Sequence, residues 1–132
     1  VVRRTTIGAQ PTVEPVVTAA KLLELQALVR RLPVSDEVTR YAVRLARMTR
    51  PGDGAPEATR QWVRWGAGPR ASQYLSLGAR VWAALHGNEV PHLDDVRAVA
   101  PAVLGHRVLL NFQAEAQGVT PARVVQELLE KA

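Results

Sequence analysis

The sequence contains no cysteine, which excludes disulfide bonds, thiolate chemistry and cysteine-bound metal centres. No apolar run approaches the roughly 20 residues of a transmembrane helix. The first residues also lack the charged and apolar regions of a signal peptide. We therefore expect a water-soluble chain with no membrane segment.

Residue patterns for nucleotide hydrolysis are absent as well. A phosphate-binding P-loop needs a Gly-Lys pair followed by Ser or Thr, yet Lys21 follows an alanine and Lys131 follows a glutamate. The adjacent carboxylates Asp36 and Glu37 follow Ser35 at a predicted helix start, where they complement the helix dipole. We predict that this chain alone holds no complete ATP site and no catalytic residue.

The three histidines are not spaced as metal ligands. His86, His92 and His106 lack the close helical spacing of a zinc site, and no cysteine accompanies them. The serines and threonines show no arrangement with histidine and aspartate that indicates a nucleophile. We predict no metal site in this chain.

Length and composition fit one compact domain. The chain has 132 residues, of which 47% are hydrophobic, and it contains no low-complexity run. It begins at Val1, and its one methionine, Met48, lies inside a helical pattern. We therefore expect a piece of a longer polypeptide, with further chemistry upstream.

The formal net charge is +5, and almost all of the cations are arginines. Such a balance raises the hypothesis of nucleic-acid binding. Arg30 and Arg31, however, fall at the end of a predicted helix, where cations complement the dipole. Arg40, Arg44 and Arg47 share one helix face and could follow phosphates, but no aromatic residues alternate with them for base stacking. We interpret that face as a solvated polar surface.

Helical spacing of apolar residues predicts an all-α fold, a small bundle of about five helices. The predicted helices begin near Thr18, Ser35, Pro69, Asp94 and Thr120, and Pro101 is expected to kink or restart the fourth. Three segments are expected to lie outside them: a linker at residues 1–17, a mobile loop at residues 51–60, and residues 108–112, which are either a helix end or a short extended crossing.

The third helix is the best-defined element of the pattern. It is predicted to run from Pro69 to His86, with Gly87 as its C-terminal stop. Its large apolar residues recur at helical spacing, and we expect them to face the core. They are Tyr74, Leu77, Val81, Trp82 and Leu85.

Residues 65–80, WGAGPRASQYLSLGAR, place Arg70 in the first turn of that helix. Pro69 suits the first helical position, and Gly66 and Gly68 would let a ligand or another chain approach closely. A cation there destabilises a helix by a few tenths to ~1 kcal/mol unless an anion lies opposite it. The residues leave two interpretations open, a bound phosphate and a structural salt bridge, and the spacing alone favours the salt bridge.

Two long segments carry a family resemblance: WGAGPRASQYLSLGARVWAALHG and NEVPHLDDVRAVAPAVLGHRVLLNFQAEAQGVT. Together they resemble the C-terminal lid of MoxR-type AAA+ ATPases. The earlier segment VSDEVTRYAVRLARMTRP is similar to the helix that precedes this lid in the family. The resemblance extends over nearly the whole chain, from about Val13 onward.

The resemblance implies an AAA+ core upstream, joined by the linker at residues 1–17 to a helical lid at residues 18–132. In such proteins the arginine of the GAGPRA-like motif is the sensor-2 residue. Gly68, Pro69 and Arg70 would then form the nucleotide-facing motif, with Arg70 as the sensor arginine. ATP and Mg²⁺ would be bound mainly by the core, and this chain alone would be inactive.

The family also implies a cytoplasmic, chaperone-like machine that remodels or matures partner proteins. The resemblance further implies a homo-hexameric ring and a partner protein that carries a von Willebrand factor A domain. Two departures stand out in this chain. Many relatives have Ser where this chain has Gly68, and the segment VPHLDDV differs from the usual Thr-Pro-Glu-Asp start, which leaves the N-cap of the fourth helix open. The pair His106 and Arg107 also matches the family, and we assign it a structural role.

Two other classes of function remain open beside the ATPase lid. One is a stand-alone helical protein-interaction module, which should expose a contiguous apolar patch and bind a protein without nucleotide. The other is an arginine-rich nucleic-acid-binding domain, whose affinity should fall steeply with salt.

Overall fold

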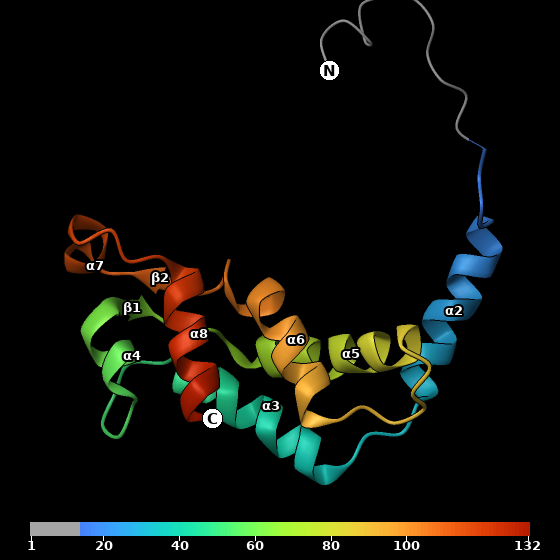
Figure 1. The fold of residues 1–132 in the computed structure, drawn as a ribbon, viewed down its shortest axis with the longest axis horizontal. Helices are drawn as coiled ribbons and strands as arrows, with labels where there is room; N and C mark the ends of the chain where they lie inside the picture. Colours follow the sequence, from blue (N-terminus) through green and yellow to red (C-terminus); the bar gives the residue numbers. More distant parts are fainter. Residues whose placement is uncertain (1–13) are drawn as a thin grey trace, which may run out of the picture.

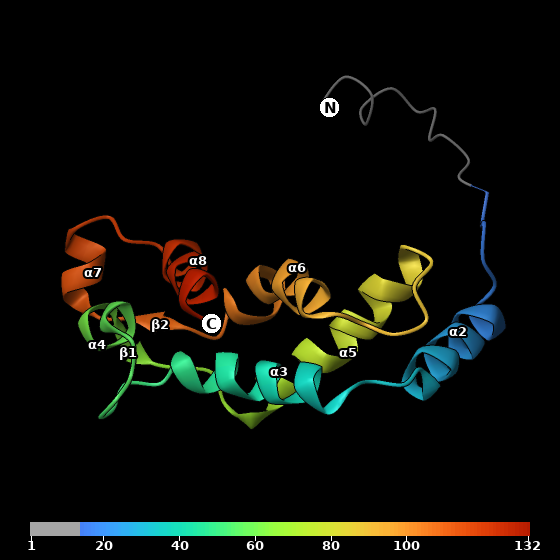
Figure 2. The same cartoon turned by 60° about the horizontal axis from the view of Figure 1, so that its bottom comes forward.

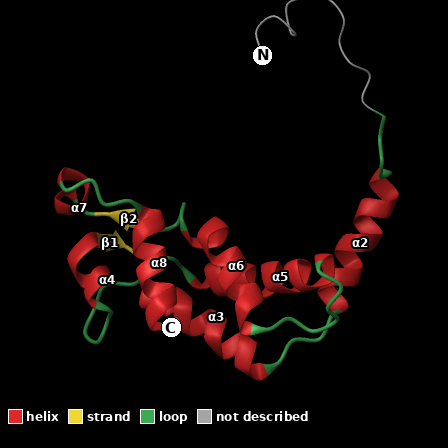
Figure 3. Cartoon of the chain, in the orientation of Figure 1, coloured by secondary structure: helices red, strands yellow, loops and turns green. Residues whose placement is uncertain are grey.

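Helices make up most of the computed structural model, which describes residues 14–132 (Figures 1 and 3). The all-α fold class is therefore confirmed. In chain order the elements are α2 (Ala19–Arg31), α3 (Asp36–Met48), α4 (Glu57–Trp62), β1 (Val63–Trp65), α5 (Pro69–Leu85), α6 (Leu93–Leu104), β2 (Leu109–Leu110), α7 (Phe112–Ala116) and α8 (Pro121–Lys131). Most of the predicted linker, residues 1–17, lies outside the described residues.

The five long helices are the predicted ones, and their starts are set by local capping. Thr18, Ser35 and Thr120 each accept a hydrogen bond from the backbone N–H three residues later, at 3.2 Å in all three cases. Such caps satisfy N–H groups that have no partner inside the helix. α6 runs without interruption through Pro101, so the predicted restart there is wrong.

The short helices α4 and α7 and the short strand β1 were not predicted. Residues 51–60 were expected to form a loop, but α4 begins at Glu57. Residues 108–112 form the extended crossing, in which β2 pairs antiparallel with β1 through Val63↔Leu110 and Trp65↔Leu109. Strands of three and two residues, and helices of six and five, are too short to show a period in the sequence.

The core lies between α3, α5, α6 and α8, each of which contributes a fully buried leucine: Leu45, Leu75, Leu104 and Leu128. In both views α4, β1, β2 and α7 gather at one end of this core, and α2 lies at the other (Figures 1 and 2). Gly78 of α5 lies so close to α6 that an added Cβ would be 3.2 Å from Val99. Small residues therefore allow the two helices to pack closely.

The predicted inward face of α5 is wrong. Four of its large apolar residues are at least 38% exposed, and Leu77 is only partly buried; the exposed ones are Tyr74, Val81, Trp82 and Leu85. The buried residues instead follow a second apolar stripe at i, i+4, i+8 and i+12: Ala71, Leu75, Ala79 and Ala83. α5 packs mainly against α6 and α3, and a stripe with three alanines lets the helices approach closely, whereas the larger residues would hold them apart.

α2 contributes nothing to the core. It has no buried residue, and Leu22 and Leu25 of its predicted apolar stripe are 52% and 41% exposed. Its main contact with the rest of the described fold is to α5, where an Arg80 guanidinium N–H donates to the backbone oxygen of Arg30 at 3.0 Å. The helix extends away from the other elements in both orientations (Figure 2). An amphipathic helix in this position leaves its apolar side open.

Asn111 joins α7 to the end of α4, and we expect Asn111→Ala to destabilise the fold. Its side-chain oxygen accepts from the Ala114 N–H at 2.9 Å, and its amide donates to the Gln61 carbonyl at 2.7 Å. Loss of such an N-cap costs about 1 kcal/mol, and the tie from α7 to the Gln61 carbonyl is lost with it. Urea unfolding measures the change, and Gln113→Ala on the exposed surface of α7 should leave the stability unaltered.

Candidate functional site

The loop at residues 66–68 carries the chain from β1 to the start of α5 and determines where Arg70 lies. It crosses the C-terminal end of α3 at Thr49 and Arg50. Pro69 then occupies the first turn of α5, as predicted. The N-cap residue is Gly68, so no side chain caps the N–H groups of this turn. The first turn of α5 is therefore attached to α3 through this loop.

Two hydrogen bonds hold the loop at Ala67. Its N–H donates to the Thr49 hydroxyl at 2.9 Å, and its carbonyl accepts from Arg50 Nε at 2.7 Å. The buried Thr49 hydroxyl in turn donates to the carbonyl of Ala46 at 2.7 Å. Both backbone groups of Ala67 are thus paired, which fixes the loop immediately before Arg70. Sequence reasoning missed Thr49 and Arg50 because their partner is seventeen or eighteen positions away.

The two glycines of the motif have different roles. A Cβ on Gly66 would collide with the backbone oxygen of Thr49 and would lie 2.7 Å from the Cα of Arg50. A Cβ on Gly68 would meet no atom within 4 Å. The close approach predicted at Gly66 is therefore taken up by the chain itself, and only Gly68 faces open space.

We expect Thr49→Val to loosen this loop. Valine has the shape of threonine but leaves the buried Ala67 N–H without a partner, at a cost of about 1–3 kcal/mol. Thr39→Val is the matched control, because the Thr39 hydroxyl is exposed and bonds only the Ser35 carbonyl of its own helix. Urea unfolding of both variants measures the difference, and equal stabilities would show that the Thr49 hydrogen bonds do not hold the loop.

Arg70 itself is exposed. Among residues 14–132 no carboxylate lies within 4.0 Å of its guanidinium. The ion pairs in this part of the chain are Lys21–Glu24, Arg97–Asp94 and Arg123–Glu127, and none of them includes Arg70. The structural salt bridge favoured by spacing alone is thus not found in the described part of the chain. A cation at an uncapped helix start, with no anion from its own domain, is unfavourable unless a ligand supplies the anion.

One turn further along α5, Tyr74 brings a second arginine to the same region. The guanidinium carbon of Arg107 lies 5.1 Å from the centre of the Tyr74 ring, and Arg107 also donates to the backbone oxygen of Val103. Nδ1 of the neighbouring His106 lies 3.1 Å from the carbonyl oxygen of Ala102. These contacts fit the structural role assigned to the pair, and no pattern in the sequence linked Arg107 to Tyr74.

The structure shows which residue of the segment VPHLDDV is the N-cap of α6. His92 is the N-cap residue, and its backbone N–H donates to a carboxylate oxygen of Asp95 at 2.7 Å. A carboxylate at the third helical position thus reaches back to the cap, as in a capping box.

Groups of three or more potential metal ligands do not occur within residues 14–132. The same part of the chain contains no helix with the length and apolar character needed to cross a membrane.

With this geometry described, comparison with known proteins defines the class. The family model of the AAA lid domain matches residues 56–128, which include the loop, Arg70 and the helices from α5 onward. The chain belongs to the AAA lid domain family.

Individual relatives extend the match to nearly the whole chain. The chain is 31% identical over 121 residues to the chaperone MoxR1 of Mycobacterium tuberculosis, covering 91% of this chain and 32% of that protein. It is 29% identical over 118 residues to the uncharacterised protein YeaC of Bacillus subtilis, covering 89% of this chain and 34% of that protein. A shorter match of 64 residues, 36% identical, joins it to MoxR of Paracoccus denitrificans, over 47% of this chain and 19% of that protein. The resemblance to MoxR-type lids is confirmed.

A solved structure agrees with the fold. The crystal structure of a candidate ATPase from Cytophaga hutchinsonii superposes with a TM-score of 0.85 at 26% identity, over 98% of this chain and 40% of that chain. The chain therefore spans about a third of the length of the first two relatives and 40% of the solved structure.

Proposed function

We propose that this chain is the C-terminal lid of a MoxR-type AAA+ ATPase and that Arg70 is its sensor arginine. The observation that carries the proposal is an exposed arginine in the first turn of α5, without a carboxylate partner among residues 14–132, behind a loop bonded to α3. A guanidinium offers five donors in a fixed fork that matches phosphate oxygens. Gly68 and Pro69 leave open space beside it.

The residues at the start of α5 fit a nucleotide phosphate. The turn has no side-chain cap and no acidic residue, so nothing in it competes with or repels an anion. ATP and Mg²⁺ would be bound mainly by a core module elsewhere in a longer polypeptide, and hydrolysis of the bound ATP would supply the free energy. Arg70 would bind phosphate oxygens of ATP when the lid lies against that core, and it would lose this contact after hydrolysis.

The coupling to motion would pass through the loop. Because Ala67 is hydrogen-bonded to Thr49 and Arg50, a displacement of Arg70 would also displace α3. We propose that the lid moves as a unit about the linker at residues 1–17, as in hinge-type closure. A ligand shifts this equilibrium only through its differential affinity for the two positions.

We further propose that the open apolar side of α2 is covered in the longer polypeptide. Leu22, Leu23, Leu25 and Leu28 are all at least 41% exposed here, and the relatives are about three times as long as this chain. A core module joined to α2 through the linker at residues 1–17 would offer a surface for these side chains. Exposed apolar area of this kind is typical of an interface.

Function at the level of the whole machine is proposed from the family. It would be a cytoplasmic homo-hexamer that couples ATP hydrolysis to chaperone-like remodelling or maturation of partner proteins. One of its partners would carry a von Willebrand factor A domain. The name of MoxR1 as a chaperone supports this direction. Steady-state ATP hydrolysis by the longer polypeptide, wild type beside Arg70→Ala, tests the central assignment.

A further inference from the structure

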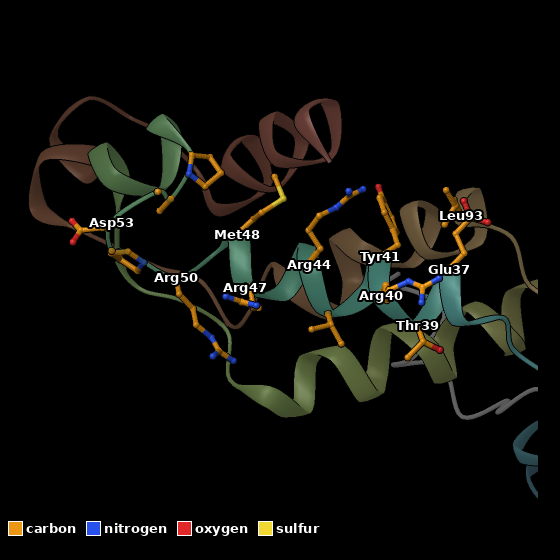
Figure 4. Close-up of a pocket in the computed structure, with 16 residues that line it drawn as sticks. Glu37, Thr39, Arg40, Tyr41, Arg44, Arg47, Met48, Arg50, Asp53 and Leu93 are labelled. Carbon is orange, nitrogen blue, oxygen red and sulfur yellow. The ribbon is translucent and has the colours of Figure 1, made fainter.

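A second surface of the molecule lies along the outer side of α3. The helix buries one face in the core, with Val38, Tyr41 and Leu45 all at most 3% exposed. The opposite face presents Arg40, Arg44 and Arg47, all exposed (Figure 4). At a rise of about 1.5 Å per residue, these three arginines follow a line roughly 10 Å long.

This line of arginines borders an open groove with a volume of ≈ 1010 Å³. The loop between α3 and α4, residues 51–56, lines one end of the groove, and Leu93 at the start of α6 lines it near the other end (Figure 4). The lining also includes the apolar side chains of Met48, Pro56 and Leu93. The groove therefore combines positive charge with apolar surface.

Three of the arginines that line the groove have no ion-pair partner within the described residues. None of the ion pairs in residues 14–132 includes Arg40, Arg44 or Arg47. Cations at i and i+4 disfavour a helix, so this arrangement carries a cost that an external anion would remove. The lining holds four arginines, counting Arg50, and two carboxylates, Glu37 and Asp53, so its net charge is positive and attracts partners of the opposite sign.

One of these arginines is held in place by a buried ring. The guanidinium carbon of Arg44 lies 5.3 Å from the centre of the Tyr41 ring, and that of Arg97 lies 5.4 Å from it. Arg97 also donates to the Tyr41 hydroxyl at 3.0 Å and to Asp94 at 2.8 Å. A cation that packs on a fixed aromatic face loses less freedom when it binds an anion.

We propose that this groove binds an acidic peptide segment of a partner protein, whose carboxylates pair with Arg40, Arg44 and Arg47 while its apolar side chains contact Met48 and Leu93. In an extended segment, alternate side chains repeat every ~6.6 Å, close to the 5–6 Å between helix positions i and i+4. The spacing of the arginines and the lining of the groove thus fit a short acidic and apolar sequence. The proposal is independent of the role of Arg70.

A nucleic acid fits this groove less well. Its phosphate chain would continue past the arginines toward Glu37 and Asp53, whose carboxylates lie toward opposite ends of the lining and would repel it (Figure 4). The one aromatic residue in the lining, Tyr41, is 3% exposed and cannot stack on a base. A peptide can place its acidic residues only where the arginines are.

The test titrates the 132-residue chain with a fluorescein-labelled octapeptide, Glu-Glu-Leu-Glu-Glu-Leu-Glu-Glu, and follows fluorescence anisotropy. We expect saturable binding by the wild type and a loss of at least about 10-fold in affinity for Arg40→Gln/Arg44→Gln/Arg47→Gln. The matched control Arg31→Gln/Arg64→Gln/Lys131→Gln removes the same charge from exposed positions outside the groove and should change the affinity less than about twofold. Circular dichroism confirms that both variants are folded.

Amide shifts in ¹H–¹⁵N spectra locate the peptide, and we expect them to change along residues 40–56. No saturable binding by the wild type, or equal losses in the two triple variants, would overturn the proposal. Tighter binding of an oligothymidylate of equal charge would assign the groove to nucleic acid instead. Arg70→Ala should bind the peptide as the wild type does, so a loss there would place the peptide on α5 and reject the groove, whatever the outcome for ATP hydrolysis.

Discussion

Replacing Arg70 with alanine in the longer ATPase should lower the rate of ATP turnover by about 100-fold, with the lid still folded. One preorganised donor to a developing charge is typically worth a factor of this size, and an arginine on a transferred phosphoryl group can be worth more. The fold should survive because Arg70 is exposed and bonds no carboxylate within residues 14–132. Steady-state hydrolysis, with circular dichroism on the same samples, measures both.

Two companion variants sharpen this measurement. Arg70→Lys keeps the charge but not the bidentate fork, so we expect a rate between those of alanine and the wild type. Arg64→Ala removes another exposed arginine, on β1 ahead of the loop, and should leave turnover unchanged. Unchanged turnover in a folded Arg70→Ala protein would return Arg70 to the role of an ordinary surface residue, and no hydrolysis by the wild type would favour a binding module.

The second large effect is expected at Gly66, where Gly66→Ser should reduce the free energy of unfolding by about 3 kcal/mol. The new Cβ collides with the backbone oxygen of Thr49 and lies 2.7 Å from the Cα of Arg50, and backbone atoms cannot turn aside as a flexible side chain can. Relief requires the loop to leave α3, which breaks the two hydrogen bonds of Ala67. Urea unfolding of the isolated chain measures this loss.

Gly68→Ser is the matched control, since it introduces the same side chain two residues away. No atom lies within 4 Å of its new Cβ, and Gly68 is the N-cap of α5, a position that serine favours. We expect this variant to be more stable than the wild type by a few tenths of a kcal/mol. Equal effects of the two substitutions would refute the distinction between a packed and an open glycine.

If Gly66 holds the loop in place, a substitution there should also affect the ATPase. A shifted loop would move the first turn of α5 and so displace Arg70, although Arg70 itself is intact. A displacement of about 1 Å at a group that positions substrate can cost as much as two orders of magnitude in rate. Turnover of Gly66→Ser, measured at a temperature where the lid remains folded, therefore reports on positioning, and turnover of Gly68→Ser should match the wild type.

How far the sequence predicted the site can be seen at residues 66–70. Proline at the first helical position placed Arg70 correctly in the first turn of α5, because this preference depends only on local backbone geometry. The partner of Arg70 could not be predicted in the same way. Spacing favoured a salt bridge, and the structure shows none within residues 14–132, since the answer depends on which carboxylates the fold brings near.

The same division holds for the fold. Capping residues and helical periods determined the class and the five long helices, because each acts within one or two turns of chain. The tertiary structure decided which face of α5 is buried, since that helix has two apolar stripes and only the one with Ala71, Leu75, Ala79 and Ala83 is inside. It also decided the pairing of β1 with β2 and the bonding of Ala67 to α3, because contacts between distant residues leave no period in the sequence.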